Sequence, residues 1–206
     1  MTLPNNFVTV FHALVNDLGL KLPWPKHVSQ PDRISTPILI WGASSSVGQF
    51  AIQILKFYGY TNIIATASSK HHAKLARYGA ARLFDYRSST VISELNSLED
   101  IPLFLDCIGS KEGSLTPISK VAKSGAKVAV LLPVIVKPAT EEDKPVYSMD
   151  IEAEATWAAG VTTSGVRTHF YEQVRPILRP LYTTLLTIPN DRMSYIGKNC
   201  NQRSCQ

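Results

Sequence analysis

The chain has 206 residues, 45% of them hydrophobic and 18% charged, so it can form a sizeable hydrophobic core. It contains no run of 18 apolar residues and does not begin with a signal peptide, and we therefore expect a cytoplasmic protein with no membrane partner. The formal net charge of +5 is scattered along the chain without a block of like charges, which argues against nucleic acid as a partner.

Residues 1–36 are expected to form a helix and a linker ahead of the main domain. Apolar side chains within residues 7–20 recur at helical spacing and predict one amphipathic helix. The following stretch, KLPWPKHVSQPDRISTP, contains four prolines and is typical of an irregular connection. The expected helical face consists of Phe7, Val10, Phe11, Leu14, Val15 and Leu18.

From residue 37 onward, short apolar runs alternate with amphipathic segments. This alternation predicts βαβ units, and hence a doubly wound parallel (Rossmann) sheet of the α/β class with about six strands and helices on both faces. We place this domain at residues 37–165 and a C-terminal helical segment and tail at residues 166–206. The predicted strands are 37–41, 62–67, 82–85, 101–106, 127–132 and 150–155, and the predicted helices are 47–58, 71–78, 89–98 and 115–122.

The stretch ILIWGASSSVGQF, residues 38–50, has the order strand, glycine turn, helix that a dinucleotide-binding turn requires. Gly42 permits a tight turn, and Gly48 lets the helix pack closely on the strand. The amides of Ser45, Ser46 and Val47 are expected at the helix start, where unpaired N–H groups favour an anion. A serine stands where the middle glycine of the motif is usual.

Other motifs with similar residues fit this turn less well. A P-loop needs Lys after its second glycine, whereas Gln49 follows here. The nucleophile elbow of α/β-hydrolases needs glycine two residues after its serine, and no glycine stands at that spacing within residues 42–46. The Tyr-x-x-x-Lys pair of short-chain dehydrogenases is absent. A plain strand-to-helix connection remains open.

The end of the second predicted strand favours NADPH over NADH. An NAD site expects an acidic residue about 20 residues beyond the glycine turn, and residues 61–84 contain none. The strand instead runs into Ser68, Ser69 and Lys70, which offer hydroxyls and a cation to a 2′-phosphate. The alternative is a solvated helix start. Asp85 and Asp106 also end predicted strands, where we expect them to cap the local backbone.

Five segments, TLPNNFVTVFHAL, ILIWGASSSVGQFAIQILK, IIATASSKHH, YGAARLFDYR and FLDCIG, occur here in this order. Together they resemble the zinc-independent branch of the medium-chain dehydrogenase/reductases, especially fungal quinone-reductase-like proteins and trans-acting enoyl reductases of polyketide synthesis. The resemblance covers residues 1–165. It implies an NADPH-dependent oxidoreductase that transfers hydride to a conjugated enone, enoyl thioester or quinone.

The resemblance also assigns cofactor-binding residues, nearly all at or after strand ends. It places Ser45, Ser46 and Val47 at the pyrophosphate, Ser68 and Lys70 at the 2′-phosphate, and Tyr86 near the adenosine ribose. It places Cys107 and Ile108 beside the adenine and ribose, Leu131 and Leu132 near the nicotinamide, and Thr9 near the cofactor. It identifies no catalytic residue in this chain.

The chain also departs from this family. Family members carry a catalytic domain of more than a hundred residues ahead of this region, so we expect the nucleotide-binding domain without it, followed by a remnant of it at 166–206. Its three cysteines, Cys107, Cys200 and Cys205, lack zinc-site spacing, and we expect no metal. The expected partners are a small-molecule or carrier-bound acyl substrate and a second copy joined at the sheet edge. The alternative is a non-catalytic NADPH-binding or partner-binding protein.

Overall fold

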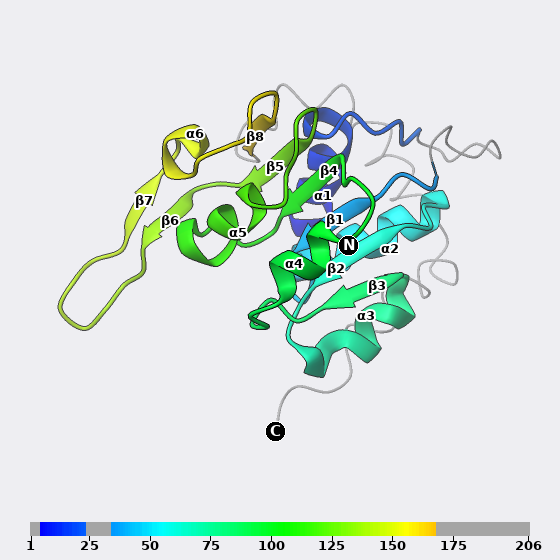
Figure 1. Ribbon diagram of the computed structural model, residues 1–206, viewed down its shortest axis with the longest axis horizontal. Helices are drawn as coiled ribbons and strands as arrows, with labels where there is room; N and C mark the ends of the chain where they lie inside the picture. Colours follow the sequence, from blue (N-terminus) through cyan, green and yellow to red (C-terminus); the bar gives the residue numbers. More distant parts are fainter. Residues whose placement is uncertain (1–4, 24–33, 168–206) are drawn as a thin grey trace.

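The computed structural model describes residues 5–23 and 34–167, in which one parallel sheet lies between two layers of helices (Figure 1). The sheet has six strands in the order β3-β2-β1-β4-β5-β8, so the chain starts at the centre and is wound outward in both directions. This order confirms the predicted doubly wound fold. The strands are β1 (Ile38–Trp41), β2 (Ile63–Thr66), β3 (Arg82–Phe84), β4 (Leu103–Asp106), β5 (Lys127–Leu131) and β8 (Thr162–Val166).

The N-terminal half of the chain covers one face of the sheet. Ile38 and Ile40 point from β1 into this layer and are fully buried there. The first helix packs on the second, with the rings of Phe7 and Phe50 in edge-to-face contact at 5.8 Å. This layer contains α1 (Asn5–His12), a π-helical turn (Ala13–Asp17), α2 (Ser46–Tyr58), a 3₁₀ turn (Ser69–His71) and α3 (His72–Tyr78).

The opposite face carries the second hydrophobic core. Leu39 and Trp41 point from β1 into it, as expected where successive side chains of a strand alternate between faces. Because both faces are covered, all four residues of β1 are buried, which explains its unbroken apolar run. The elements here are α4 (Val91–Asn96), a π-helical turn (Lys111–Leu115), α5 (Thr116–Ser119) and α6 (Ile151–Glu154).

One predicted strand is wrong. Residues 150–155 form no strand, because the Asp150 carboxylate accepts hydrogen bonds from the amides of Glu152 and Ala153, at 3.1 and 3.2 Å, and so caps α6. The sixth strand of the sheet is instead β8, which pairs in parallel with β5. The alternation of polar and apolar residues that suggested a strand is too short to distinguish it from a capped helical turn.

A second sheet, which the sequence analysis missed, projects from the domain as an antiparallel hairpin (Figure 1). It consists of β6 (Val134–Lys137) and β7 (Val146–Ser148), joined by an exposed acidic loop. The other predicted strands and helices are found at the expected places; the bounds of most are shorter, whereas α2 begins one residue earlier than predicted. Part of the predicted linker, the helical segment expected near 170–186, Cys200 and Cys205 lie outside the described residues. In the described ranges, no helix combines the length and apolar character needed to cross a membrane.

Candidate cofactor site

The glycine turn joins the end of β1 to the start of α2 and is tied to β2. Gly42 has a φ of +76°, and its N–H donates to the Thr66 hydroxyl at 3.2 Å. The N–H of Ala43 donates to the Thr66 carbonyl at 2.9 Å. A Cβ at residue 42 would lie 2.4 Å from the outer atoms of the exposed Ile108 side chain, which would have to move, and the positive φ is the stronger reason for glycine here.

The start of α2 presents two unpaired backbone donors. The Ser45 hydroxyl caps the helix by accepting from the Gly48 N–H at 3.1 Å, and the Ser45 N–H donates to the Gly42 carbonyl at 3.0 Å. No described residue accepts a hydrogen bond from the Ser46 or Val47 N–H. Of the three amides expected at a pyrophosphate, these two are therefore open to an anion, with the positive end of the helix dipole behind them.

The N-terminal helix α1 reaches this turn through a residue that the sequence analysis missed. The Asn6 side-chain amide donates to the Ser46 hydroxyl at 2.6 Å. Thr9, one turn further along, is buried, and its hydroxyl donates within α1 to the Asn5 carbonyl at 2.9 Å. Asn6, rather than Thr9, therefore forms the hydrogen bond from α1 to the turn. No sequence pattern marks this contact, because it depends on how α1 packs on α2.

The Ser45 cap can be tested by itself. Ser45→Ala is expected to lower the free energy of unfolding by about 1 kcal/mol, because the Gly48 N–H loses its acceptor. Chemical denaturation with urea measures this change. Ser44→Ala, at the preceding position, is the matched control and should change stability by less than about 0.5 kcal/mol. Equal losses in the two variants would contradict the assignment of Ser45 as the cap.

The ends of β2 and β3 form a polar cluster around Arg87. Its guanidinium donates through Nη2 to the Ser68 hydroxyl at 2.8 Å and through Nε to the Tyr86 hydroxyl at 3.2 Å. The guanidinium carbon lies 5.3 Å from the centre of the Tyr86 ring. Ser68 is buried, whereas Lys70 and Arg87 are exposed. The sequence analysis placed Ser68, Lys70 and Tyr86 at the site but missed Arg87, whose signal was its position directly after Tyr86.

Asp85 connects this cluster to the loop after β2 by hydrogen bonds. Its carboxylate accepts from the N–H and the hydroxyl of Ser69, at 3.0 and 2.9 Å, and from the Arg87 N–H at 3.0 Å. These hydrogen bonds, first from Arg87 and then from Ser69, lower the pKa of Asp85 below its ordinary value. The expected local cap is confirmed. The region at the ends of β2 and β3 thus contains one acidic residue, Asp85, and two cationic residues, Lys70 and Arg87.

The ends of β4 and β5 also lie at the carboxyl edge of the sheet, beside the glycine turn. Ile108 is 44% exposed and lies against Gly42, and Leu131 ends β5 on the other side of β4. Cys107 is buried, and burial raises the pKa of its thiol well above the ordinary value, so the thiol stays protonated. Leu132 follows β5 and is half-buried. The parallel register therefore places Ile108 next to the glycine turn, and Leu131 next to the segment that carries Ile108.

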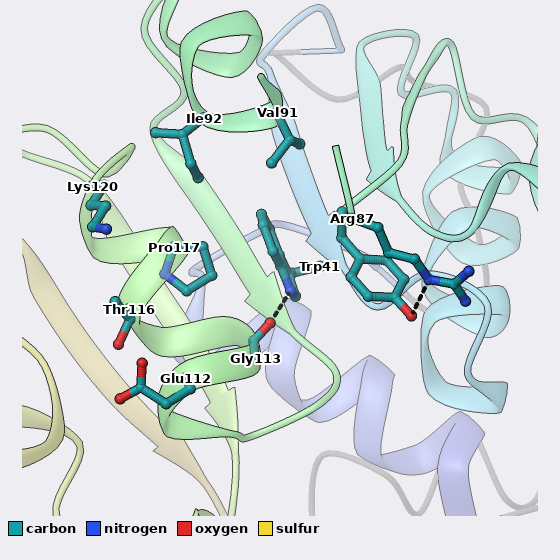
Figure 2. Close-up of a pocket in the computed structure, with 10 residues that line it drawn as sticks. Trp41, Arg87, Val91, Ile92, Glu112, Gly113, Thr116, Pro117 and Lys120 are labelled. Carbon is teal, nitrogen blue, oxygen red and sulfur yellow. Dashed lines mark hydrogen bonds between the residues drawn. The ribbon is translucent and has the colours of Figure 1, made fainter. Parts of the chain in front are cut away.

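A groove of about 480 Å³ opens between α4 and α5, beside the Arg87 cluster (Figure 2). Its floor includes Trp41, whose indole N–H donates to the Gly113 carbonyl at 3.0 Å. The sequence analysis did not predict it, because its walls come from separate segments. Apolar and charged side chains both line it: Trp41, Tyr86, Arg87, Val91, Ile92, Glu112, Gly113, Thr116, Pro117 and Lys120. Within residues 5–23 and 34–167, no group of three His, Cys, Asp or Glu side chains is arranged to hold a metal ion.

The comparison with known families agrees with this architecture. Residues 46–168, more than half of the chain, match the family described as zinc-binding dehydrogenase. The chain belongs to this family. The resemblance to the medium-chain dehydrogenase/reductases is thereby confirmed for the nucleotide-binding domain. That the chain belongs to the zinc-independent branch of this family remains a prediction.

Similar proteins include yeast and filamentous fungal members of this family. An uncharacterized protein of Saccharomyces cerevisiae is 31% identical over 163 residues, which cover 78% of this chain and 42% of the relative. The trans-enoyl reductase tazE of Aspergillus terreus is 53% identical over 58 residues, which cover 28% of this chain and 19% of the relative. The chain therefore spans less than half the length of these curated relatives.

Solved structures show the same fold at low sequence identity. The CurK enoyl reductase superposes with a TM-score of 0.60 at 20% identity, covering 95% of this chain and 51% of that one. The benzyl alcohol dehydrogenase of Acinetobacter calcoaceticus gives a TM-score of 0.57 at 20% identity, covering 87% and 44%. Both likenesses concern the fold.

Proposed function

We propose that this chain is the nucleotide-binding domain of an NADPH-dependent reductase that acts on conjugated enones, enoyl thioesters or quinones. The observation that carries the proposal is the pairing of two anion-binding features on one edge of the sheet. These are the open amides of Ser46 and Val47 and the cluster around Arg87. Ligands of doubly wound folds bind at this carboxyl edge, where the strand order reverses between β1 and β4.

The two features suit the two phosphate groups of NADPH. The Ser46 and Val47 amides would hold the pyrophosphate, since uncharged backbone donors at a helix start bind phosphate oxygens. Arg87, with Ser68 and Lys70, would hold the 2′-phosphate, because guanidinium matches phosphate in charge and geometry. The groove beside Arg87 offers apolar side chains to the adenine.

The bound cofactor would supply the hydride, and the protein's part would be to bind and orient it. Leu131 and Leu132 would form an apolar border near the reacting ring and help to exclude water from it, whereas Cys107 and Ile108 would lie beside the adenine and ribose. The substrate class follows from relatives such as tazE, which is named a trans-enoyl reductase. A carrier-bound acyl thioester is therefore the first substrate to test.

Nucleotide selectivity tests the proposal directly. Calorimetric titration should show NADPH binding at least about tenfold more tightly than NADH, which corresponds to roughly 1.4 kcal/mol from contacts with the 2′-phosphate. Lys70→Ala should weaken NADPH binding and leave NADH binding nearly unchanged, and Lys74→Ala on the adjacent helix is its control. Equal binding of both nucleotides, or none, would refute the cofactor assignment.

Turnover is a separate measurement. The assay follows the loss of the absorbance of reduced nicotinamide as NADPH is oxidised, with quinones and enoyl thioesters as acceptors. It decides whether this chain reduces a substrate. Binding of NADPH without turnover on any acceptor would support the non-catalytic alternative for this chain.

A further inference from the structure

Asp106 is a fully buried carboxylate at the end of β4, next to the candidate site but without a place in the cofactor contacts described above. One of its oxygens accepts from the N–H groups of Ile108 and Gly109, at 2.8 and 3.2 Å. The other accepts from the Ser114 hydroxyl at 2.6 Å. All three donors belong to the segment that follows β4, so this carboxylate helps to fix how that segment leaves the sheet, together with the hydrogen bond from the Cys107 N–H to the Trp41 carbonyl.

The segment held by Asp106 packs between two parts of the candidate site. The side chain of Ile108 fills the space above Gly42, where a Cβ would be 2.4 Å away. Gly109 has a φ of +61°, and a Cβ there would be 2.3 Å from the Leu131 carbonyl oxygen. Because Ile108 lies against Gly42 and Gly109 lies against the Leu131 carbonyl, a rotation of the 107–109 backbone would move Ile108 relative to the glycine turn.

We propose that Asp106 is a positioning residue for the nucleotide site: its ionised carboxylate holds residues 107–109 so that Ile108 stays beside the glycine turn, and it thereby sets the affinity for the nucleotide. The affinity part of this inference rests on the proposed function. The positioning part rests on the hydrogen bonds and close contacts alone.

Protonation should loosen this arrangement. Burial raises the pKa of Asp106 to about 6, although the hydrogen bonds from Ser114, Ile108 and Gly109 act in the opposite direction. The Ser114 hydroxyl has a second acceptor, the Ser110 carbonyl at 3.0 Å, to which it can turn when Asp106 becomes neutral. The segment then loses its charge-assisted hydrogen bonds, which are roughly twice as strong as neutral ones. Nucleotide affinity should therefore fall as the pH drops through about 6.

Few other titratable groups act on Asp106. Cys107 follows it and stays protonated, because burial and then the Asp106 charge raise the pKa of its thiol. On the turn packed against Asp106, Lys111 pairs with Glu154 at 3.1 Å, and Glu112 lines the groove. The residues opposite Asp106 on β1 and β5 are the uncharged Trp41 and Val130.

Protonation of Asp106 is expected to lower nucleotide affinity but to raise the stability of the fold. A raised pKa means that the folded protein binds this proton more tightly than the unfolded chain does. The contribution of Asp106 to stability is therefore fully present below pH ~4 and is lost as the pH rises through about 6. If Asp106 acted only through stability, nucleotide affinity and stability would change in the same direction with pH. If it positions the segment, they change in opposite directions.

Titration of three proteins with NADPH and NADH between pH 5 and 8 tests the affinity part. Asp106→Asn keeps an acceptor for the two amides and a donor for Ser114 but lacks the charge. At pH 7.5 it should bind both nucleotides about five- to tenfold more weakly than the wild type, with little dependence on pH. The wild-type affinity should approach that of the variant below pH 6 for NADH too, which has no 2′-phosphate to titrate. Asp150→Asn, which also removes a charge that caps two amides, should match the wild type.

Wild-type affinity in Asp106→Asn at pH 7.5, or an unchanged pH dependence in that variant, would overturn the inference. Amide hydrogen exchange without ligand tests the positioning part. The Ile108 and Gly109 amides should exchange faster in Asp106→Asn than in the wild type after correction for stability. Unchanged exchange would overturn the positioning role. If none of the three proteins binds either nucleotide, the affinity part and the proposed function are both overturned, and the exchange rates still decide whether Asp106 positions the segment.

Discussion

Replacing Arg87 by alanine is expected to weaken NADPH binding roughly 10- to 100-fold and NADH binding less than about twofold. The guanidinium already contacts Ser68 and Tyr86, which pre-orders it beside the end of β2. A hydrogen bond to a charged group contributes about 1.5–3 kcal/mol, and only NADPH carries the 2′-phosphate that would receive it. Calorimetric titration of wild type and variant with both nucleotides measures the two changes.

Arg82→Ala is the matched control for this experiment. Arg82 is exposed and is the first residue of β3, whereas Arg87 lies beyond the end of this strand. Each variant removes one positive charge, but only Arg87→Ala removes a side chain of the polar cluster. Arg87→Lys should recover only part of the loss, because an ammonium cannot contact Ser68 and Tyr86 as a planar fork does. Equal weakening of NADPH and NADH in Arg87→Ala would show that the cluster supports the fold rather than the 2′-phosphate.

Gly48→Ala is expected to lower the free energy of unfolding by about 2–3 kcal/mol, although alanine is the better helix former. A Cβ at residue 48 would lie 2.6 Å from the Ala43 Cα, and backbone atoms cannot move aside as a flexible side chain can. The start of α2 must then shift away from the turn, and the Ser46 and Val47 amides with it. Urea denaturation should show the loss of stability, and nucleotide titration a parallel loss of affinity.

Gly59→Ala provides the control at the other end of the same helix. Gly59 has a φ of +94°, but no atom lies within 4 Å of the position of a Cβ there. The substitution should cost about 1 kcal/mol through backbone strain alone and leave nucleotide affinity unchanged. If Gly48→Ala proved as stable as the wild type, the close contact between α2 and the turn would be refuted.

Much of the central fold could be predicted from the sequence, because its signals are local. The buried run of β1, the glycine turn and the apolar face of α2 follow one another within residues 38–58, and each has its own periodicity or steric requirement. The sequence does not predict the hairpin β6–β7, and its alternation at residues 150–155 wrongly predicts a strand. Both lie near the end of the domain, where segments are short and a few residues of alternating polarity fit several structures.

The candidate site was predicted less completely than the fold. Ser68 and Tyr86 were identified, but Arg87 was not, because its contact with Ser68 exists only once β2 and β3 pair in parallel. The sequence predicts Asp85 as a local cap but not its contact with Ser69, which reaches across the same pair of strands. The groove depends on helices α4 and α5 being brought together over Trp41.

The amino-acid sequence alone was enough to establish the doubly wound fold, the glycine turn and the serines at the ends of β1 and β2. These features depend on patterns within a few consecutive residues, which tertiary contacts do not alter. The folded domain was needed to show that Ser45 caps its helix, that Ser46 and Val47 keep open amides, and that Arg87 and Asp106 make the hydrogen bonds on which their proposed roles rest. The contact between Ser68 and Arg87 joins residues 19 positions apart and forms only because β2 and β3 pair. The hydrogen bonds of Ser45 and Asp106 are local, but they depend on a backbone geometry that the sequence pattern does not specify.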